Sequence, residues 1–126
     1  IHKFSRRIDA GEQIPVFGDG TSARDYTHIS DLVAGILSCL DRLLAGRLSH
    51  SIYNLGSDRP ISLDEMIATI EQALGRKAVI ERLPMQQGDV VRTWADLSRS
   101  RAELSYDPQM DFADGVADFV RWLRAR

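Results

Sequence analysis

The sequence predicts a small α/β domain made of short strands and four or five helices, without a Rossmann domain. Three observations support this fold class. Helical apolar spacing alternates with apolar runs that are too short for a doubly wound sheet, and no glycine-rich dinucleotide motif follows any of these runs. The 126 residues are enough for one domain with one core.

Two helices are predicted in the first part of the chain. Residues 3–8 have the pattern of the last turns of a helix that Gly11 ends, so we expect a fragment of a longer protein. Residues 31–45 carry an apolar stripe that we expect to contribute to the core, with Cys39 as a buried thiol. The stripe consists of Val33, Ile36, Leu37, Leu40 and Leu44.

Three more helices are predicted in the second part, each beginning at a capping residue. Ser62 and Glu65 form a capping box, while Ser98 and Asp111 each precede a helical pattern. The predicted helices cover residues 62–74, 98–104 and 111–125.

Short apolar or alternating runs predict the strands. They lie at Val16 and Phe17, at 51–56, where we expect a buried strand, at 77–83 and at 93–95.

Composition limits the classes of partner. The net charge is −2, with 16 basic and 18 acidic residues interspersed, so the chain has no basic stripe for nucleic acid. No apolar run approaches the ~20 residues of a membrane span, and the three histidines lack metal-site spacing. We expect a cytoplasmic protein that binds neither metal, nucleic acid nor membrane.

The turn after the first strand is the most informative segment. Gly18 and Gly20 permit a tight turn and the close approach of a ligand. Arg24 follows, and its planar guanidinium can bind a phosphate. The alternative is a surface turn in which Arg24 and Asp25 form an ion pair.

Four segments in register resemble the C-terminal domain of extended short-chain dehydrogenase/reductases, the NAD-dependent sugar-nucleotide epimerases and dehydratases. They are Ile14–Gly20 with Arg24-Asp25-Tyr26 and Asp31; Ile52–Gly56; Leu83–Val90 with Thr93–Asp96; and Leu104–Pro108 with Gly115–Trp122. The resemblance implies that residues 1–126 are the C-terminal nucleotide-sugar-binding domain of a longer enzyme.

Site residues follow from the resemblance by position. It implies that Arg24 contacts the diphosphate, that the strand at Val16 and Phe17 lines the uracil site, and that Asp89 bonds the ribose hydroxyls. It also implies that Gln86 lies near the diphosphate and ribose. An arginine suits a diphosphate, and a carboxylate accepts well from a vicinal diol.

Asn54 is implied on the pyrophosphate side. Alternatives stay open for these polar residues. Asp89 could cap a turn, and Asn54 could bond its own turn. Asp25 and Asp31 could serve as an internal ion pair and a helix-start acid.

The segment from Pro84 to Val90 resembles UDP-glucuronate 4-epimerases most. UDP-glucose 4-epimerases usually have a basic residue at the position of Gln86, and this chain has Gln87 where the UDP-glucuronate group usually has proline. The alternatives are the substrate domain of a UDP-glucose 4-epimerase or of a nucleotide-sugar 4,6-dehydratase, a non-catalytic nucleotide-sugar-binding module, or a purely structural domain.

The family's catalytic Tyr-x-x-x-Lys pattern is absent, since none of Tyr26, Tyr53 and Tyr106 has a lysine four residues later. The resemblance therefore implies that the chain alone has no catalytic residues, binds no NAD and is inactive. In the parent enzyme, a Rossmann domain preceding these residues would bind NAD and form the homodimer. NAD would oxidise the C4 hydroxyl of a UDP-sugar, and the ketone would rotate and be reduced again.

Overall fold

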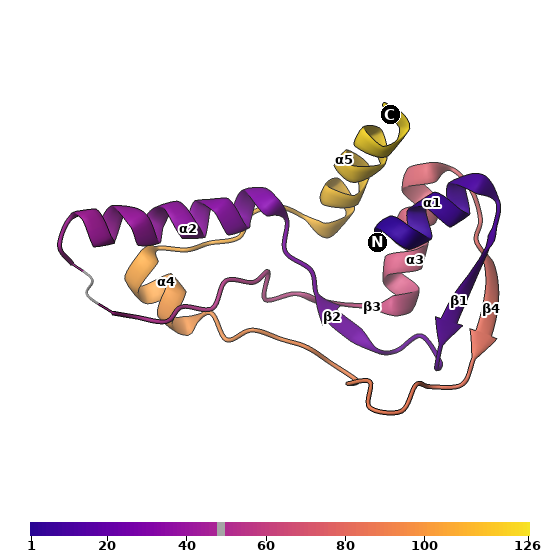
Figure 1. Ribbon diagram of the computed structural model, residues 1–126, viewed down its shortest axis with the longest axis horizontal. Coiled ribbons are helices and arrows are strands. Elements are labelled where there is room, and N and C mark those ends of the chain that lie inside the picture. The colour runs from indigo at the N-terminus through magenta and orange to yellow at the C-terminus, as the bar shows by residue number, and fades with distance from the viewer. Residues whose placement is uncertain (48–49) are drawn as a thin grey trace. The chain divides into compact units, whose positions relative to one another are not determined.

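The computed structural model describes residues 1–47 and 50–126, and five helices and four short strands lie within these ranges (Figure 1). This confirms the predicted fold class. The helices are α1 (His2–Ala10), α2 (Ile29–Leu44), α3 (Leu63–Leu74), α4 (Ser98–Leu104) and α5 (Phe112–Arg124). The strands are β1 (Gln13–Phe17), β2 (Ala23–Asp25), β3 (Pro60–Ser62) and β4 (Val79–Leu83).

Two compact units divide the chain, although its length predicts a single core. Unit 1 comprises Ile1–Arg24, Ile61–Thr93 and Asp111–Arg126, and unit 2 comprises Asp25–Pro60 and Trp94–Met110. Among the described helices, none has both the length and the apolar character needed to cross a membrane.

Unit 1 is built on a parallel pair of strands. β1 pairs with β4 in a register that runs from Gln13 opposite Val79 to Phe17 opposite Leu83 (Figure 1). Helix α3 packs against both α1 and α5, and α1 also contacts β1. The apolar core of this unit consists of Ile8, Ile14, Val16, Met66, Ile67, Ile70, Leu74, Val116 and Val120.

The predicted boundaries of three helices in unit 1 are confirmed by their caps. Ser62 Oγ accepts a hydrogen bond from the Glu65 amide (3.1 Å), and Asp111 Oδ1 accepts one from the Ala113 amide (2.8 Å). Gly11 ends α1 in the left-handed conformation with φ of 76°. Local sequence therefore determines where these helices begin and end.

The caps in unit 2 differ from the prediction. The N-cap position of α4 is Leu97, not Ser98, and the Asp96 carboxylate before it accepts from the Ser98 amide (2.9 Å). At the start of α2, His28 Nδ1 accepts from the Ser30 amide (3.3 Å). Histidine is not among the preferred N-cap residues, so capping preferences could not predict this cap.

The strand predicted at 51–56 is wrong. This segment lies outside the four strands, and Ile52 is 75% exposed. A strand needs a neighbouring backbone to pair with, and here side chains take its alternate carbonyl oxygens instead. The Arg99 guanidinium donates to the Ile52 carbonyl (3.2 Å), Ser100 Oγ donates to the Asn54 carbonyl, and Tyr106 Oη donates to the Gly56 carbonyl (2.9 Å).

Unit 2 has its own small core. Leu97, Leu104 and Tyr106 are buried in it, and four half-buried residues pack around them: Cys39, Tyr53, Leu55 and Ala95. Cys39 is therefore only partly buried.

Helix α2 buries a glycine on its inner face, while most of its large apolar residues are exposed. Its buried residues are Asp31 and Gly35, and a Cβ on Gly35 would come within 2.6 Å of a Leu55 methyl group. The stripe expected to contribute to the core is instead exposed, since close approach at Gly35 leaves it on another side of the helix. The exposed residues are Ile29, Val33, Ile36, Leu37, Leu40, Leu43 and Leu44.

We expect Gly35→Ala to destabilise the protein. Alanine in a helix is favoured over glycine by about 1 kcal/mol, whereas overpacking against Leu55 and Tyr106 costs about 1–3 kcal/mol. Denaturant unfolding should show a net loss. Ala34→Gly, at an exposed position of α2, measures the propensity contribution alone. A stabilised Gly35→Ala variant would contradict the tight contact.

The exposed stripe of α2 should make the chain self-associate, because an apolar patch of this kind favours association. We expect Ile36→Lys/Leu40→Lys to reduce both the mass measured by light scattering at high concentration and the binding of a hydrophobic dye. Ala34→Lys, which adds charge beside the stripe, is the control. Concentration-independent monomers without dye binding in the unmodified chain would contradict this expectation.

Candidate functional site

The parallel pairing of β1 and β4 brings two loops to one edge of the sheet. The Gly18 amide continues the ladder by donating to the Leu83 carbonyl (2.9 Å), so the turn after β1 and the loop after β4 leave side by side. A Cβ on Gly18, whose φ is 75°, would lie 3.1 Å from Met85 Sδ. The carboxyl ends of parallel strands are the usual ligand-binding edge of an α/β sheet.

Backbone bonds hold the end of the second loop against β2. The Ala23 amide donates to the Val91 carbonyl (2.8 Å), and the Thr93 amide donates to the Ala23 carbonyl (3.1 Å). These bonds make one parallel bridge between Ala23 and Arg92, and the strand predicted at 93–95 does not form.

These backbone bonds at Ala23 place Arg24 against Asp89. A nitrogen of the Arg24 guanidinium lies 2.6 Å from Asp89 Oδ1, and the two side chains are 28% and 37% exposed. The other terminal nitrogen of Arg24 donates to the Ala23 carbonyl (2.9 Å). Arg24 therefore forms an ion pair with Asp89, which lies 65 residues away in the sequence.

Gln86 lies in the same loop as Asp89. The Asp89 amide donates to the Gln86 carbonyl (3.3 Å), closing a turn that contains Gly88 with φ of 85°. Asp89 thus closes a turn through its backbone while its carboxylate contacts Arg24. The structure brings together Arg24, Gln86 and Asp89, three of the residues implied by the resemblance.

Val16 and Phe17 differ in what they can offer a ligand. The Val16 side chain is fully buried, whereas Phe17 is half-buried. Backbone groups alternate in direction along a strand, and the Gly18 amide points to β4, so the N–H and C=O of Phe17 point away from β4. In the described residues β4 is the one strand paired with β1. The Phe17 backbone therefore faces the unpaired edge.

The turn between β1 and β2 is ordered internally. Asp19 Oδ1 accepts from the Thr21 hydroxyl (2.6 Å) and amide (3.0 Å), and these hydrogen bonds lower the pKa of Asp19. A Cβ on Gly20 would overlap the Asp64 carboxylate, while the Asp64 amide donates to the Gly20 carbonyl (3.1 Å). Gly20 thus permits close packing on α3, and its open side is not available to a ligand.

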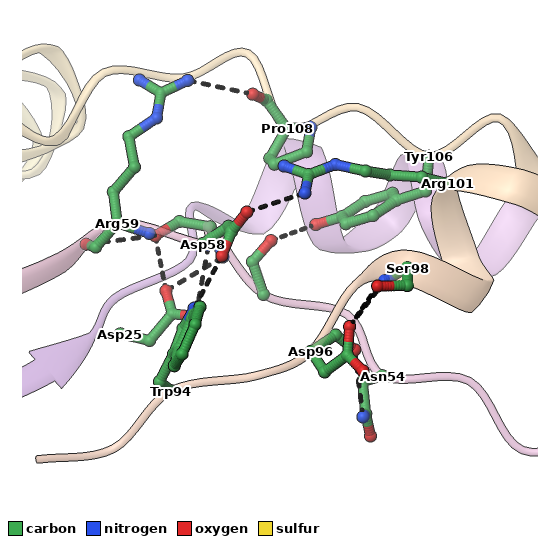
Figure 2. A network of polar contacts seen from close by, with 12 residues as sticks. Asp25, Asn54, Asp58, Arg59, Trp94, Asp96, Ser98, Arg101, Tyr106 and Pro108 are labelled. Carbon is green, nitrogen blue, oxygen red and sulfur yellow. Dashed lines mark hydrogen bonds and ion pairs between the residues drawn. The ribbon is translucent and has the colours of Figure 1, made fainter.

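Asn54 lies in unit 2, within a network of polar contacts (Figure 2). Its side-chain amide donates to the Asp96 carbonyl (3.2 Å) and its backbone carbonyl accepts from Ser100 Oγ. Asn54 therefore bonds Asp96 before α4 and Ser100 within α4, and not its own turn. These contacts give it a structural role within unit 2.

Asp58 is the centre of the rest of this network (Figure 2). It has a left-handed backbone, with φ of 60°, and accepts from the Trp94 indole (2.6 Å) and the Arg101 guanidinium (2.7 Å). These two hydrogen bonds lower the pKa of the Asp58 carboxyl. The Asp58 amide donates to Asp25 (3.3 Å), which also accepts from the Ser57 amide (2.9 Å).

Asp31 acts as both a helix-start acid and a link within unit 2. It lies in the first turn of α2, and its two carboxylate oxygens accept from the amides of Gln109 (3.1 Å) and Met110 (3.0 Å). Asp31 is 8% exposed, so its role is structural. Sequence reasoning anticipated the helix-start role but missed Asp58 and the link from Asp31 to 109–110, because their partners are distant in sequence.

The described elements do not form the strand, glycine-rich turn and helix of a dinucleotide site. A dinucleotide site needs a glycine-rich turn between a strand and the N-terminus of a helix. Here β1 leads through Gly18 and Gly20 into β2, and β4 leads into a loop. The described residues also contain no group of three or more His, Cys, Asp or Glu side chains that could hold a metal ion.

Comparisons with known proteins agree with this architecture. The chain superposes on DesIV, a dTDP-glucose 4,6-dehydratase from Streptomyces venezuelae solved with NAD, with a TM-score of 0.86 and 30% identity over 100% of this chain and 38% of that one. A mutant of the UDP-glucuronic acid 4-epimerase from Bacillus cereus, solved with NAD and UDP-4-deoxy-4-fluoro-glucuronic acid, gives a TM-score of 0.85 and 27% identity over 97% and 39%. The fold is thus that of part of an extended short-chain dehydrogenase/reductase.

Sequence comparison gives the family. The GDP-mannose 4,6-dehydratase family matches residues 1–119, so the chain belongs to this family of sugar-nucleotide epimerases and dehydratases. The UDP-glucuronate 4-epimerase of Thermodesulfobacterium geofontis is 36% identical over 98% of this chain and 37% of its own length. An uncharacterised protein of Methanocaldococcus jannaschii, MJ1055, is 42% identical over 96% and 36%. The chain thus spans well under half the length of these relatives.

The network at Asp58 generates a pH prediction. Because the folded-state pKa of Asp58 is lowered, its contribution to stability is present above the unfolded value of about 3.9 and is lost as pH falls through the folded value. Asp58→Asn tolerates the left-handed backbone. Because this variant has no carboxyl to protonate at this position, it should lose less stability in acid. Denaturant midpoints at neutral pH and below about pH 4 measure this, with Asp41→Asn as the charge control. Equal acid sensitivity in unmodified protein and Asp58→Asn would argue against the prediction.

Proposed function

We propose that this chain is the substrate-binding part of an NAD-dependent sugar-nucleotide epimerase, with a UDP-sugar as ligand and UDP-glucuronate as the preferred one. The observation that carries the proposal is the meeting of Arg24 and Asp89 beside the carboxyl ends of β1 and β4. The similarity to UDP-glucuronate 4-epimerases supports the sugar assignment.

Each part of a UDP group has a suitable partner in unit 1. The Arg24 guanidinium binds the diphosphate, and the Asp89 carboxylate accepts from the ribose hydroxyls. The Phe17 N–H donates to a uracil carbonyl oxygen while its C=O accepts from the uracil N3–H. Gln86 lies between the ribose and the diphosphate. Val16 supports the strand from inside the core, and Asn54 serves the fold of unit 2.

NAD binding and catalysis belong, in this proposal, to a Rossmann domain of the parent enzyme. The relatives are more than twice as long as the matched region, and two structural relatives were solved with NAD. This domain would cover the exposed stripe of α2 and would also form the homodimer. A cytoplasmic location is likewise part of the proposal.

A 4,6-dehydratase is the second candidate. The matching family is described as GDP-mannose 4,6-dehydratase, and DesIV, at 30% identity, acts on a dTDP-sugar. A dehydratase that acts on a dTDP-sugar differs from the epimerase at the ribose, because a dTDP-sugar lacks the vicinal diol that Asp89 would bind, whereas a GDP-sugar keeps this diol. Tighter binding of UDP-glucuronate than of dTDP-glucose or GDP-mannose supports the epimerase, and tighter binding of either of the other two supports the dehydratase.

We expect Arg24→Ala to weaken the binding of UDP-glucuronate by about ten- to a hundredfold, because one charge-assisted hydrogen bond contributes about 1.5–3 kcal/mol. Isothermal titration calorimetry measures this on the chain of 126 residues. Arg82→Ala is the matched control, since Arg82 also pairs with a carboxylate, Asp64, in unit 1 (3.0 Å). Equal affinities for the two variants would show that Arg24 has no part in binding.

A further inference from the structure

Asp89 contacts Arg24 directly, and this contact has consequences for selectivity. The distance of 2.6 Å is at the short end for a charge-assisted N–H···O hydrogen bond. With the second terminal nitrogen on the Ala23 carbonyl, both ends of the guanidinium fork are engaged by the protein itself. An incoming phosphate therefore meets an arginine of which two of the five N–H donors, one on each terminal nitrogen, are already engaged.

The Asp89 carboxylate is placed by its own backbone. On one side, the turn from the Gln86 carbonyl to the Asp89 amide requires the left-handed Gly88. On the other side, two residues later, the Val91 carbonyl is fixed by the Ala23 amide. Because Ala23 immediately precedes Arg24, the backbone bond between Ala23 and Val91 places both partners of the ion pair.

A carboxylate oxygen and a phosphate oxygen offer a guanidinium equivalent charge-assisted bonds. A diphosphate that takes the Arg24 nitrogen facing Asp89 therefore displaces this carboxylate, leaving it half-exposed beside a new anion. This repulsion is unfavourable unless Asp89 gains other donors. The two hydroxyls of a ribose are such donors, whereas inorganic pyrophosphate has no diol to offer.

We infer that Asp89 is a selectivity residue: it occupies Arg24 in place of phosphate and releases it to ligands whose ribose diol can bind the freed carboxylate. The site thereby discriminates against bare phosphates, which would otherwise compete for the arginine. This inference rests on the proposed function and adds to it a ligand-exchange step at the Arg24–Asp89 pair.

The test compares inorganic pyrophosphate with UDP on the unmodified chain and on Asp89→Asn, by isothermal titration calorimetry. Asp89→Asn should bind pyrophosphate about tenfold more tightly, since Arg24 is free, and UDP no more tightly than before. The preference for UDP over pyrophosphate should therefore fall at least tenfold. Circular dichroism establishes that each variant is folded.

Two controls separate exchange at Arg24 from a general loss of negative charge. Asp64→Asn removes the same charge from the Arg82 pair of unit 1 and should leave pyrophosphate binding unchanged. In the double variant Arg24→Ala/Asp89→Asn, the gain for pyrophosphate should disappear. A gain that persists there, or appears equally in Asp64→Asn, would overturn the inference.

The failure of the inference is distinct from that of the proposed function. If UDP binds and Arg24→Ala weakens it, but Asp89→Asn leaves pyrophosphate affinity unchanged, the exchange step is wrong and the binding site stands. If UDP does not bind the unmodified chain, the proposed function itself fails and the inference fails with it.

Discussion

The parallel pairing of β1 with β4 is the constraint on which the candidate site depends. It joins segments that are more than sixty residues apart, and their carboxyl ends can only emerge at the same edge. Beyond that edge, the backbone bond between Ala23 and Val91 joins the two loops that follow β1 and β4. These backbone bonds bring Arg24 and Asp89 together. The buried side chains of Ile14 and Val16 anchor β1 in the core of unit 1.

Helices could be predicted from the sequence better than strands because their information is local. The Ser62 and Asp111 side chains lie within three residues of the amides that they cap. A strand depends on a distant neighbour instead. Residues 51–56 have strand-like composition, yet side chains from α4 and Tyr106 take their carbonyl oxygens. Composition alone could not distinguish these two ways of satisfying an extended backbone.

The candidate site could be predicted as a set of residues but not as an arrangement. The family resemblance selected Arg24, Gln86 and Asp89, and the structure places these three together. It could not show that Arg24 pairs with Asp89, because nothing local links them. It also could not separate the two turn glycines, since only packing shows that Asp64 fills the space beside Gly20 while Gly18 faces Met85.

The exposed stripe of α2 shows what an apolar pattern does and does not encode. Periodicity predicts that one face of a helix avoids water, but it does not say which surface covers that face. In unit 2, the small residue Gly35 makes the close contact with Leu55, and the large residues remain outside. A helix of this kind has two faces with separate functions: a small face that stabilises unit 2, and an apolar face that needs a covering surface. The chain spans 36–37% of the length of two of its relatives, so we assign the covering residues to the rest of the proposed longer protein. The apolar pattern of α2 is therefore explained at the level of the longer protein that we propose, and not by the core of unit 2.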